Sequence, residues 1–549
     1  MIINSKNNNI LRRYTKYIIL LSLLFFIIYS FLAIQTPEKF SSPDENANFL
    51  FSKQFIENSK FEFDEPLNIQ FDNIIHPRNS VATDSKIVPF SFIGFIFILG
   101  IIGKIFGLYS LYFVTPFFAA ISGIYFFILL KEIFSLKISF LSTLIYFIHP
   151  AIWYYSSLSF QHNSLFLSFL ILSLFSLVYL IKNNKTLYYL LFGLFLAITC
   201  MIRTNEIVWI LFLILSILFL YRKKIKFVKL LLCTLIFIIA LSPMLILNNT
   251  FYGNPLKFGY FNSSNSNNND IKNQKNSAIS FLLNKPKKIL FPSGINLNKT
   301  IDTFYKYQIK IFYLYFFLLL IGFYIIFNDF RLYKKSHKTY ILLFTIVSTY
   351  LIIYYGSGTY FGSTSSNLKE IYISSSLVRY WLPIYTFGIP VIITSILNIL
   401  NLFNKKNKKI FIFSLITILF LFSANTVYNF PDSGLIKISE NEHLYKKISH
   451  DIINTVGKDS IIITNQTDKI IYPERKVIAL HSDLENNNRL DNKWDLIYGL
   501  LDQYNVYYFT MYGSNIDTIN NKINNNKIII RPLKTIQDIS SLYQLQRIN

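Results

Sequence analysis

Cysteine is nearly absent from this sequence: only Cys200 and Cys233 occur among 549 residues. Both lie within apolar stretches, so a structural disulfide between exposed loops is excluded. The sequence also has no Walker A motif, no HExxH motif and no Cys/His cluster with zinc spacing. An ATP-driven pump or a soluble nucleotide enzyme is therefore disfavoured, and no metal or other cofactor is assumed.

Charged residues are few as well, at 15% of the chain, whereas 52% of the residues are hydrophobic. The mean hydropathy of +0.40 excludes a soluble chain. The apolar residues form runs of about 20 residues, the length that crosses a hydrocarbon core of about 30 Å. The chain is therefore a multi-pass membrane protein. Lys and Arg outnumber Asp and Glu by 53 to 29, but much of this excess lies in short loops between apolar runs, where it marks topology rather than nucleic-acid binding.

The N-terminal part of the chain predicts its orientation in the cell membrane. Basic residues precede the first apolar run, Tyr17 to Ile34, and no small-residue cleavage site follows it. We therefore expect an uncleaved span with a cytoplasmic N-terminus. The next segment, 35–86, is acidic where the inside loops are basic, and it is expected to lie outside. Eleven further apolar runs follow, at approximately 87–106, 108–130, 138–156, 163–181, 187–202, 206–221, 229–247, 309–327, 339–355, 379–400 and 410–427.

Three basic clusters mark inside loops, within residues 222–229, 331–338 and 405–409. The long segments between them, including 248–308, and everything after residue 427 are then expected outside. An inside N-terminus and an outside C-terminus require an odd number of crossings, whereas twelve runs are present. We therefore expect 11 or 13 spans in a transmembrane domain covering residues 1–427.

Residues 428–549 lack long apolar runs and are expected to form a small extracytoplasmic α/β domain. Short apolar runs predict strands, and helical patterns alternate with them. The strand predictions are Ser460 to Thr464, Val477 to Leu480, Val506 to Thr510 and Lys527 to Ile530, and the helix predictions are His443 to Val456 and Asn492 to Tyr504.

An acidic pair follows the first span in the sequence Ser42-Pro43-Asp44-Glu45-Asn46. Adjacent carboxylates above a membrane surface can accept a proton from a hydroxyl nucleophile or hold a divalent cation. The alternative interpretation is a helix start, in which Pro43 occupies the first turn and the helix dipole stabilises the two acids.

Three arginines lie near predicted membrane borders: Arg78, Arg203 and Arg379. Guanidinium groups bind phosphate bidentately. An unpaired charge at the membrane border is also costly, so these residues are candidates for binding a lipid-linked phosphate. Each also has a simpler interpretation. Arg203 could pair with Glu206 three residues later, Arg379 could anchor the chain at the interface, and Arg78 could be a solvated loop residue.

The order of these motifs resembles that of the GT-C class of polytopic glycosyltransferases, in particular the protein O-mannosyltransferases and aminoarabinose-type lipid A transferases. The resemblance extends over roughly residues 12–400. It is carried by Pro43-Asp44-Glu45, Pro89, Pro150 with Tyr154-Tyr155-Ser156, Arg203-Thr204-Asn205, Gly253-Asn254-Pro255-Leu256 with Gly259-Tyr260, Pro292-Ser293-Gly294, and Arg379-Tyr380-Trp381-Leu382-Pro383.

The resemblance implies transfer of a sugar from a polyprenyl-phosphate donor to a protein, lipid or glycan acceptor at the outer face. It implies that Asp44 is the catalytic base and that Glu45 orients it or the acceptor. An inverting displacement of this kind needs one carboxylate and a cationic site for the departing phosphate. Arg78, Arg203 and Arg379 would then converge on the donor phosphate.

The substrate cleft is expected to include four further residues, His76, His162, Asn254 and Tyr380. A lone histidine such as His162 is more often structural, and the segment around Asn254 is typical of a turn. The chain departs from the related enzymes, since it has neither an inserted β-trefoil-like domain nor the signature motifs of the oligosaccharyltransferase catalytic subunit.

Two other functions are compatible with many spans and interfacial arginines. A transporter or flippase of lipid-linked sugars usually places charges near the bilayer midplane and shows repeat symmetry, neither of which is seen in this sequence. A polymerase or ligase of surface polysaccharide would use a lipid-linked donor with arginines in a large outer loop.

Overall fold

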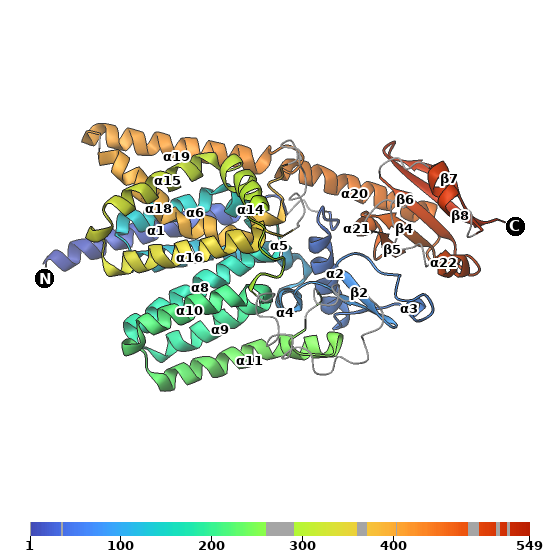
Figure 1. Ribbon diagram of the computed structural model, residues 1–549, viewed down its shortest axis with the longest axis horizontal. Helices are drawn as coiled ribbons and strands as arrows, with labels where there is room; N and C mark the ends of the chain where they lie inside the picture. The colour runs from blue at the N-terminus through green and yellow to red at the C-terminus, as the bar shows by residue number, and fades with distance from the viewer. Residues whose placement is uncertain are drawn as a thin grey trace.

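A computed structural model describes residues 2–33, 37–257, 259, 290–358, 371–401, 403–480, 494–511, 516–523 and 527–548. Most of the chain forms an elongated helical bundle, and a small sheet domain lies at one end of it (Figure 1). This agrees with the predicted fold class. The low-complexity stretch 262–276 lies outside the described residues.

The bundle is built from helices that follow the apolar runs. Six helices in the described residues are long and apolar enough to cross a membrane, or up to nine if each of three bent pairs is one span. The prediction of 11 or 13 spans stays a prediction. The helices are α1 (Ile2–Ser30), α4 (Ile93–Phe106), α5 (Leu111–Lys131), α6 (Leu136–Ile148), α7 (Pro150–Ser156), α8 (His162–Asn183), α9 (Thr186–Ile202), α10 (Ile207–Leu220), α11 (Phe227–Tyr252), α14 (Leu297–Phe304), α15 (Tyr313–Asn328), α16 (Lys335–Gly356), α17 (Ser376–Tyr380), α18 (Leu382–Asn401) and α19 (Lys405–Tyr428).

Helix α8 forms the centre of this bundle and α11 its margin. In the most apolar 18-residue window of α8, 83% of the residues are buried, whereas the corresponding share in α11 is 11%. The side chains of α11 are therefore exposed on the surface that would face lipid. One predicted run, 138–156, is bent, and the two predicted runs 187–202 and 206–221 meet at a sharp turn. Helices α6 and α7 meet at 56° just before Pro150, and the run from α9 to α10 turns by 114° at Arg203. Proline explains the first bend because it cannot donate the helical hydrogen bond.

Close backbone packing fixes the end of α9 that carries Arg203. A Cβ atom added to Gly94 of α4 would lie 2.5 Å from the main-chain oxygen of Met201. Only glycine therefore allows the two helices to approach this closely. The end of α9 is thereby held against the start of α4.

The polar segment 37–89 covers one end of the bundle. It contains α2 (Pro43–Asn58), β1 (Phe63–Asp64), α3 (Leu67–Gln70), β2 (Ser80–Thr83) and β3 (Lys86–Pro89). The three strands form an antiparallel sheet in the order β1-β3-β2.

The C-terminal domain begins with α20 (Leu435–Thr455) and contains a five-stranded sheet in the order β5-β4-β6-β8-β7. Strand β4 pairs in parallel with β5 and β6, whereas β8 runs antiparallel to β6 and β7. The four predicted strands are present, whereas the fifth strand, β8, was not predicted. The elements are β4 (Ile461–Asn465), α21 (Asp468–Ile471), β5 (Lys476–Leu480), α22 (Trp494–Leu500), β6 (Val506–Thr510), α23 (Ile516–Ile523), β7 (Ile528–Ile536) and β8 (Ser540–Arg547).

The N-terminus and the C-terminal domain lie at opposite ends of the molecule (Figure 1). The turns that carry the three basic clusters, between α10 and α11, α15 and α16, and α18 and α19, lie at the N-terminal end. One end of the bundle is therefore basic, and the segment 37–89 with the C-terminal domain occupies the other.

Candidate functional site

The acidic pair Asp44 and Glu45 lies in the first turn of α2. Ser42 caps this helix, with its side-chain oxygen accepting a hydrogen bond from the Asp44 main-chain nitrogen at 3.2 Å, and Pro43 occupies the first helical position. This is the local geometry of the helix-start interpretation. Both acids are nevertheless buried, at 9% and 4% exposure. The cap therefore directs two carboxyl groups into the protein instead of into solvent.

The Asp44 carboxylate is held by two partners from distant parts of the chain. Its Oδ2 forms an ion pair with Nη2 of Arg379 at 2.8 Å, and both side chains are only 11–12% exposed. Its Oδ1 accepts a hydrogen bond from the Asn79 amide at 2.7 Å. Two contacts on different oxygens fix the plane of the carboxylate.

Glu45 lies beside this ion pair in a different environment. Burial raises the pKa of Glu45 from 4.5 to about 7, although a hydrogen bond from Gln161 and the positive charge of Arg379 oppose the rise. Glu45 therefore holds its proton more tightly than an ordinary glutamate does. The two adjacent acids have different chemical surroundings.

Arg379 connects the acidic pair to the membrane helices. It lies on α17, where Nη1 donates to the Gln161 side chain at 2.5 Å and Nη2 to Ser376 at 3.1 Å. Its main-chain oxygen accepts from the Asn163 amide at 3.3 Å. The guanidinium is thus placed by the start of α8 and directed towards α2.

Arg203 lies at the break between α9 and α10, 1% exposed. It pairs with Glu206 at 2.6 Å, as the simpler interpretation of this residue proposed. Its Nη1 also lies 3.0 Å from Nε2 of His162, and Nη2 donates to the Tyr355 hydroxyl at 3.0 Å. These partners hold a buried cation that would otherwise be costly.

Two of the three predicted arginines converge on one aromatic ring. The guanidinium carbon of Arg203 lies 4.6 Å from the centre of the Tyr380 ring, and that of Arg379 lies 5.4 Å from it. Cation–π contacts of this kind stabilise positive charge beside a tyrosine. His162 and Tyr380, both predicted to line the substrate cleft, therefore lie with Arg203 and Arg379 beside the acidic pair.

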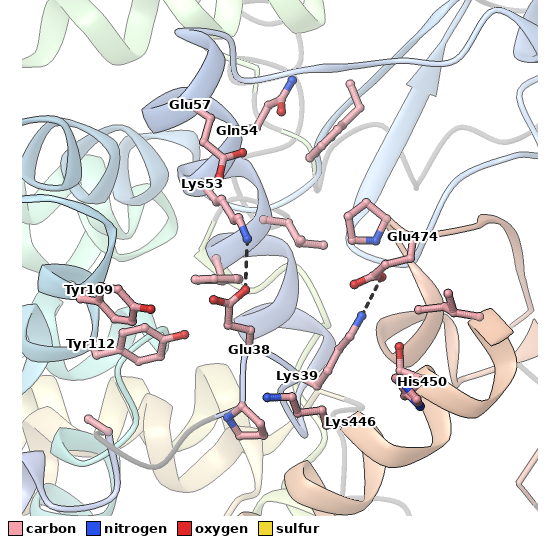
Figure 2. Close-up of a pocket in the computed structure, with 18 of the residues that line it drawn as sticks. Glu38, Lys39, Lys53, Gln54, Glu57, Tyr109, Tyr112, Lys446, His450 and Glu474 are labelled. Carbon is pink, nitrogen blue, oxygen red and sulfur yellow. Dashed lines mark hydrogen bonds and ion pairs between the residues drawn. The ribbon is translucent and has the colours of Figure 1, made fainter. Parts of the chain in front are cut away.

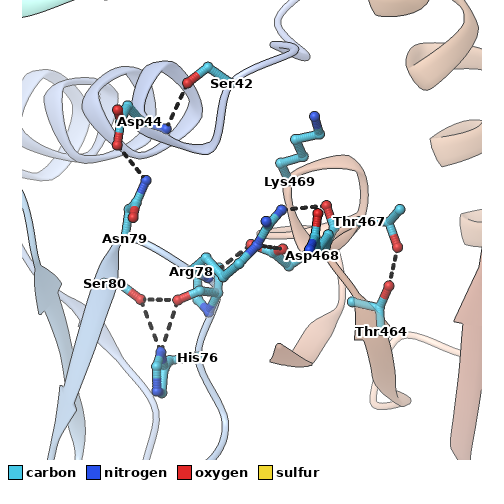
Figure 3. Close-up of polar contacts among 12 residues, drawn as sticks. Ser42, Asp44, His76, Arg78, Asn79, Ser80, Thr464, Thr467, Asp468 and Lys469 are labelled. Carbon is cyan, nitrogen blue, oxygen red and sulfur yellow. Dashed lines mark hydrogen bonds and ion pairs between the residues drawn. The ribbon is translucent and has the colours of Figure 1, made fainter. Parts of the chain in front are cut away.

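Arg78 is directed to the C-terminal domain instead. Its Nε pairs with Oδ1 of Asp468 at 2.6 Å, its main-chain nitrogen donates to Oδ2 at 2.9 Å, and Nη2 donates to the main-chain oxygen of Gln466 (Figure 3). The neighbouring residue, Asn79, is the one that contacts Asp44. The structure therefore separates Arg78 from the pair formed by Arg203 and Arg379.

The contacts of His76 and Asn254 involve other parts of the chain. The ring nitrogen Nδ1 of His76 lies 2.9 Å from the oxygen of Pro77, and His76 forms a β-bridge with Ile478 of the C-terminal domain. Asn254 accepts a hydrogen bond from the Leu256 main-chain nitrogen at 2.9 Å, which is the geometry of a turn. His76 therefore lies in the same segment as Arg78, and Asn254 lies in a turn after α11.

The structure adds contacts that the sequence did not indicate. Gln161 precedes His162 and Asn79 follows Arg78 in the sequence. Their position next to a predicted site residue was the only sequence feature that could have indicated them. Glu442 and Lys469 belong to the C-terminal part of the chain, and both bind the main chain of Ser41, just before α2. No sequence spacing connects positions about 400 residues apart.

A cavity of about 860 Å³ borders another face of α2 (Figure 2). Ion pairs between Lys39 and Glu474 and between Lys53 and Glu38 cross it, and Tyr109 is part of its aromatic wall. Neither Asp44 nor Arg379 lines this cavity. This cavity is therefore distinct from the contacts between Asp44 and Arg379. Among the described residues, no group of three or more His, Cys, Asp or Glu could hold a metal ion.

Comparison with known proteins gives the following matches. Residues 91–247 match the family of dolichyl-phosphate-mannose-protein mannosyltransferases. The structure is similar to ArnT from Cupriavidus metallidurans in the apo state, with a TM-score of 0.54, 9% identity, and coverage of 96% of this chain and 98% of that one. ArnT bound to undecaprenyl phosphate gives a TM-score of 0.53, 8% identity and the same coverage.

An archaeal structure is similar as well. The oligosaccharyltransferase of Archaeoglobus fulgidus in the apo form gives a TM-score of 0.50 and 10% identity, covering 89% of this chain and 69% of that one. No curated protein matches the chain in sequence. At these identities the structural likeness shows a shared fold.

Proposed function

We propose that this chain, which has the GT-C glycosyltransferase fold, transfers a sugar from a polyprenyl-phosphate donor to an acceptor at the outer face of the cell membrane. The observation that carries the proposal is the buried ion pair between Asp44 and Arg379, together with a second buried arginine, Arg203, in contact with the same Tyr380 ring. The match of residues 91–247 to mannosyltransferases that use dolichyl phosphate mannose supports a lipid-phosphate donor, as does the likeness to ArnT solved with undecaprenyl phosphate.

In the proposed reaction, Asp44 accepts the proton of the acceptor nucleophile as that atom attacks the anomeric carbon. The bond from the anomeric carbon to the phosphate oxygen breaks, and the phosphate leaves with the electron pair. A lipid phosphate needs no protonation to leave, so a second, acidic carboxyl group is unnecessary, in contrast to a glycosidase. Inversion at the anomeric carbon follows from a single displacement.

Arg379 provides the direct contact to the donor phosphate in this proposal. Its guanidinium already pairs with the Asp44 carboxylate, and phosphate oxygens can accept the same pair of hydrogen bonds. Arg203 adds positive charge beside the same Tyr380 ring, and its own partners hold it there. Developing negative charge in a site with little water is stabilised strongly by such preorganised cations. We do not assign Arg78 to the phosphate, because its guanidinium is directed to Asp468 and Gln466 of the C-terminal domain.

Glu45 acts beside the base in the proposed mechanism. Its bond with Gln161 links it to Arg379, because Gln161 also accepts from that guanidinium. Glu45 therefore fixes the position of the arginine relative to Asp44.

The proposed orientation follows from charge. The basic turns lie at the end of the bundle that contains the N-terminus, and basic loops are retained in the cytoplasm. The acidic pair and the C-terminal domain lie at the opposite end, outside. The acceptor, a protein, lipid or glycan of the cell envelope, reaches Asp44 from that side.

The test uses the purified protein with a labelled polyprenyl-phosphate sugar and cell-envelope acceptors. We expect the wild-type protein to transfer label covalently and Asp44→Asn to lose transfer, because the amide keeps the shape of the side chain and removes the proton acceptor. Asp84→Asn is the matched control: this exposed residue of the same segment has φ of 53°, which asparagine also adopts.

Equal turnover by Asp44→Asn and the wild type would remove Asp44 from the role of base. Movement of intact lipid-linked sugar across vesicle membranes without covalent transfer would instead identify a flippase.

A further inference from the structure

Two sets of contacts connect the C-terminal domain with the surroundings of the acidic pair of α2. One set of contacts runs through Arg78 and Asn79, and the other runs through Ser41, directly before the helix cap (Figure 3). Both sets begin at α21, whose first two residues are Asp468 and Lys469. The short helix α21, more than 400 residues after Asp44 in the sequence, therefore contacts both Arg78 and Ser41.

The first route is a chain of charge-assisted contacts. Asp468 is 1% exposed and holds Arg78 at both the side chain and the main chain, at 2.6 and 2.9 Å. The next residue, Asn79, has φ of 57°, an unusual conformation for a residue other than glycine, and donates to Asp44 at 2.7 Å. Holding Arg78 on both its nitrogen and its guanidinium fixes where the Asn79 amide points.

The second route fixes the start of α2. Lys469 donates to the main-chain oxygen of Ser41, and Glu442 of α20 accepts from the Ser41 main-chain nitrogen at 3.2 Å. Ser41 precedes the cap residue Ser42, so both peptide groups of Ser41 are held by the C-terminal part of the chain. The entry angle of the helix that carries Asp44 is thereby set from outside the bundle.

From these contacts we propose that α21 of the C-terminal domain positions the Asp44 carboxylate, and that Asp468 is a positioning residue for the reaction. This inference rests on the proposed function. It makes the C-terminal domain a part of the active-site architecture, in contact with the base through one intervening pair of residues. Asp468 does not touch the reacting atoms.

The chain offers a matched control for this inference. Lys476 of β5 pairs with Glu65 at 2.7 Å, which is another ion pair between the C-terminal domain and the segment 37–89. No described contact connects that pair with Asp44. Lys476→Gln therefore removes one bond between the same two parts of the protein, while the Asp468 route stays intact.

The experiment measures kcat and the donor KM for the full-length wild type, Asp468→Asn and Lys476→Gln. We expect Asp468→Asn to lower kcat by about tenfold to a hundredfold, because a misplacement of about 1 Å has effects of this size. The donor KM should stay within about twofold, since the phosphate contact remains. Lys476→Gln should keep the wild-type kcat. Asn79→Ala, which breaks the same route one step later, should lower kcat to a similar extent, and the double variant of Asn79 and Asp468 should be little worse than either single one.

Wild-type kcat in Asp468→Asn would overturn the inference. Equal losses in Asp468→Asn and Lys476→Gln would overturn it too, because the effect would then be one of general domain attachment. Melting temperatures of both variants distinguish loss of folding, and additive effects of Asn79 and Asp468 would contradict a shared route. The proposed function fails separately, if the wild type transfers no sugar or if Asp44→Asn retains transfer.

Discussion

Replacing Glu45 with glutamine should change the pH dependence of stability in a defined direction. Glu45 is 4% exposed, and burial raises the pKa of its carboxyl group from 4.5 to about 7. The folded protein therefore binds this proton more tightly than the unfolded chain does. The resulting stabilisation is complete below pH 4.5 and is lost as the pH rises through 7.

The size of the effect follows from the shift in pKa. One pKa unit corresponds to about 1.4 kcal/mol, so a rise from 4.5 to about 7 corresponds to about 3 kcal/mol. Glutamine has the shape of the protonated acid and does not titrate. The stability of Glu45→Gln relative to wild type should therefore increase by about 3 kcal/mol between pH 4.5 and pH 8.

Thermal unfolding of the detergent-solubilised protein measures this change at pH 4.5 and at pH 8. The control is Glu57→Gln, at an exposed carboxylate of the same helix α2, where the side chain stays in water and the substitution should act alike at both pH values. The reasoning is refuted if the difference in melting temperature between Glu45→Gln and wild type is independent of pH. An equally large pH dependence in Glu57→Gln would refute it as well.

Three further predictions concern the arginines and the topology. Arg379→Lys keeps the charge but loses the fork, so donor KM should rise by about tenfold to a hundredfold, and an unchanged KM would exclude direct phosphate contact. Glu206→Gln leaves Arg203 with an uncompensated buried charge and should destabilise the protein by about 3–5 kcal/mol in thermal unfolding, whereas a neutral result would show that His162 and Tyr355 suffice. A tag at Leu435 should be accessible from outside the cell and one at Lys224 only after permeabilisation; protection of Leu435 would reverse the proposed orientation.

The bundle could be predicted from the sequence because hydrocarbon imposes a strict length on apolar runs. Strands β4, β5, β6 and β7 of the C-terminal domain could also be predicted, since short apolar runs alternate there with helical patterns, whereas β8 was not predicted. The bends were not visible. The run from α9 to α10 reads as two similar apolar blocks, and hydropathy carries no information on the 114° turn between them. That turn places Arg203 inside the protein.

Pairing over long distances limited the prediction of the site. Arg203 and Glu206 are three residues apart, so their ion pair was foreseeable, whereas Arg78 and Asp468 are 390 residues apart. A charged side chain near a membrane border predicts that some partner exists, because the unpaired charge is costly. It does not say whether the partner is a substrate phosphate or a carboxylate of the same chain. For Arg78 the structure supplies the carboxylate.

The two interpretations of Asp44 and Glu45 turn out to be compatible. A helix start needs a cap, a proline and acids in the first turn, and α2 has all three. Successive residues of a helix differ in direction by about 100°, so the cap that orients the helix also sends its two acids into different surroundings. Asp44 meets Arg379 and Asn79, and Glu45 meets Gln161 and lines a small pocket of about 30 Å³. One acid is ion-paired beside the cationic site while its neighbour holds a proton near neutral pH. The cap geometry is thus the physical reason why the two adjacent carboxyl groups have the different surroundings on which the proposed roles of Asp44 and Glu45 depend.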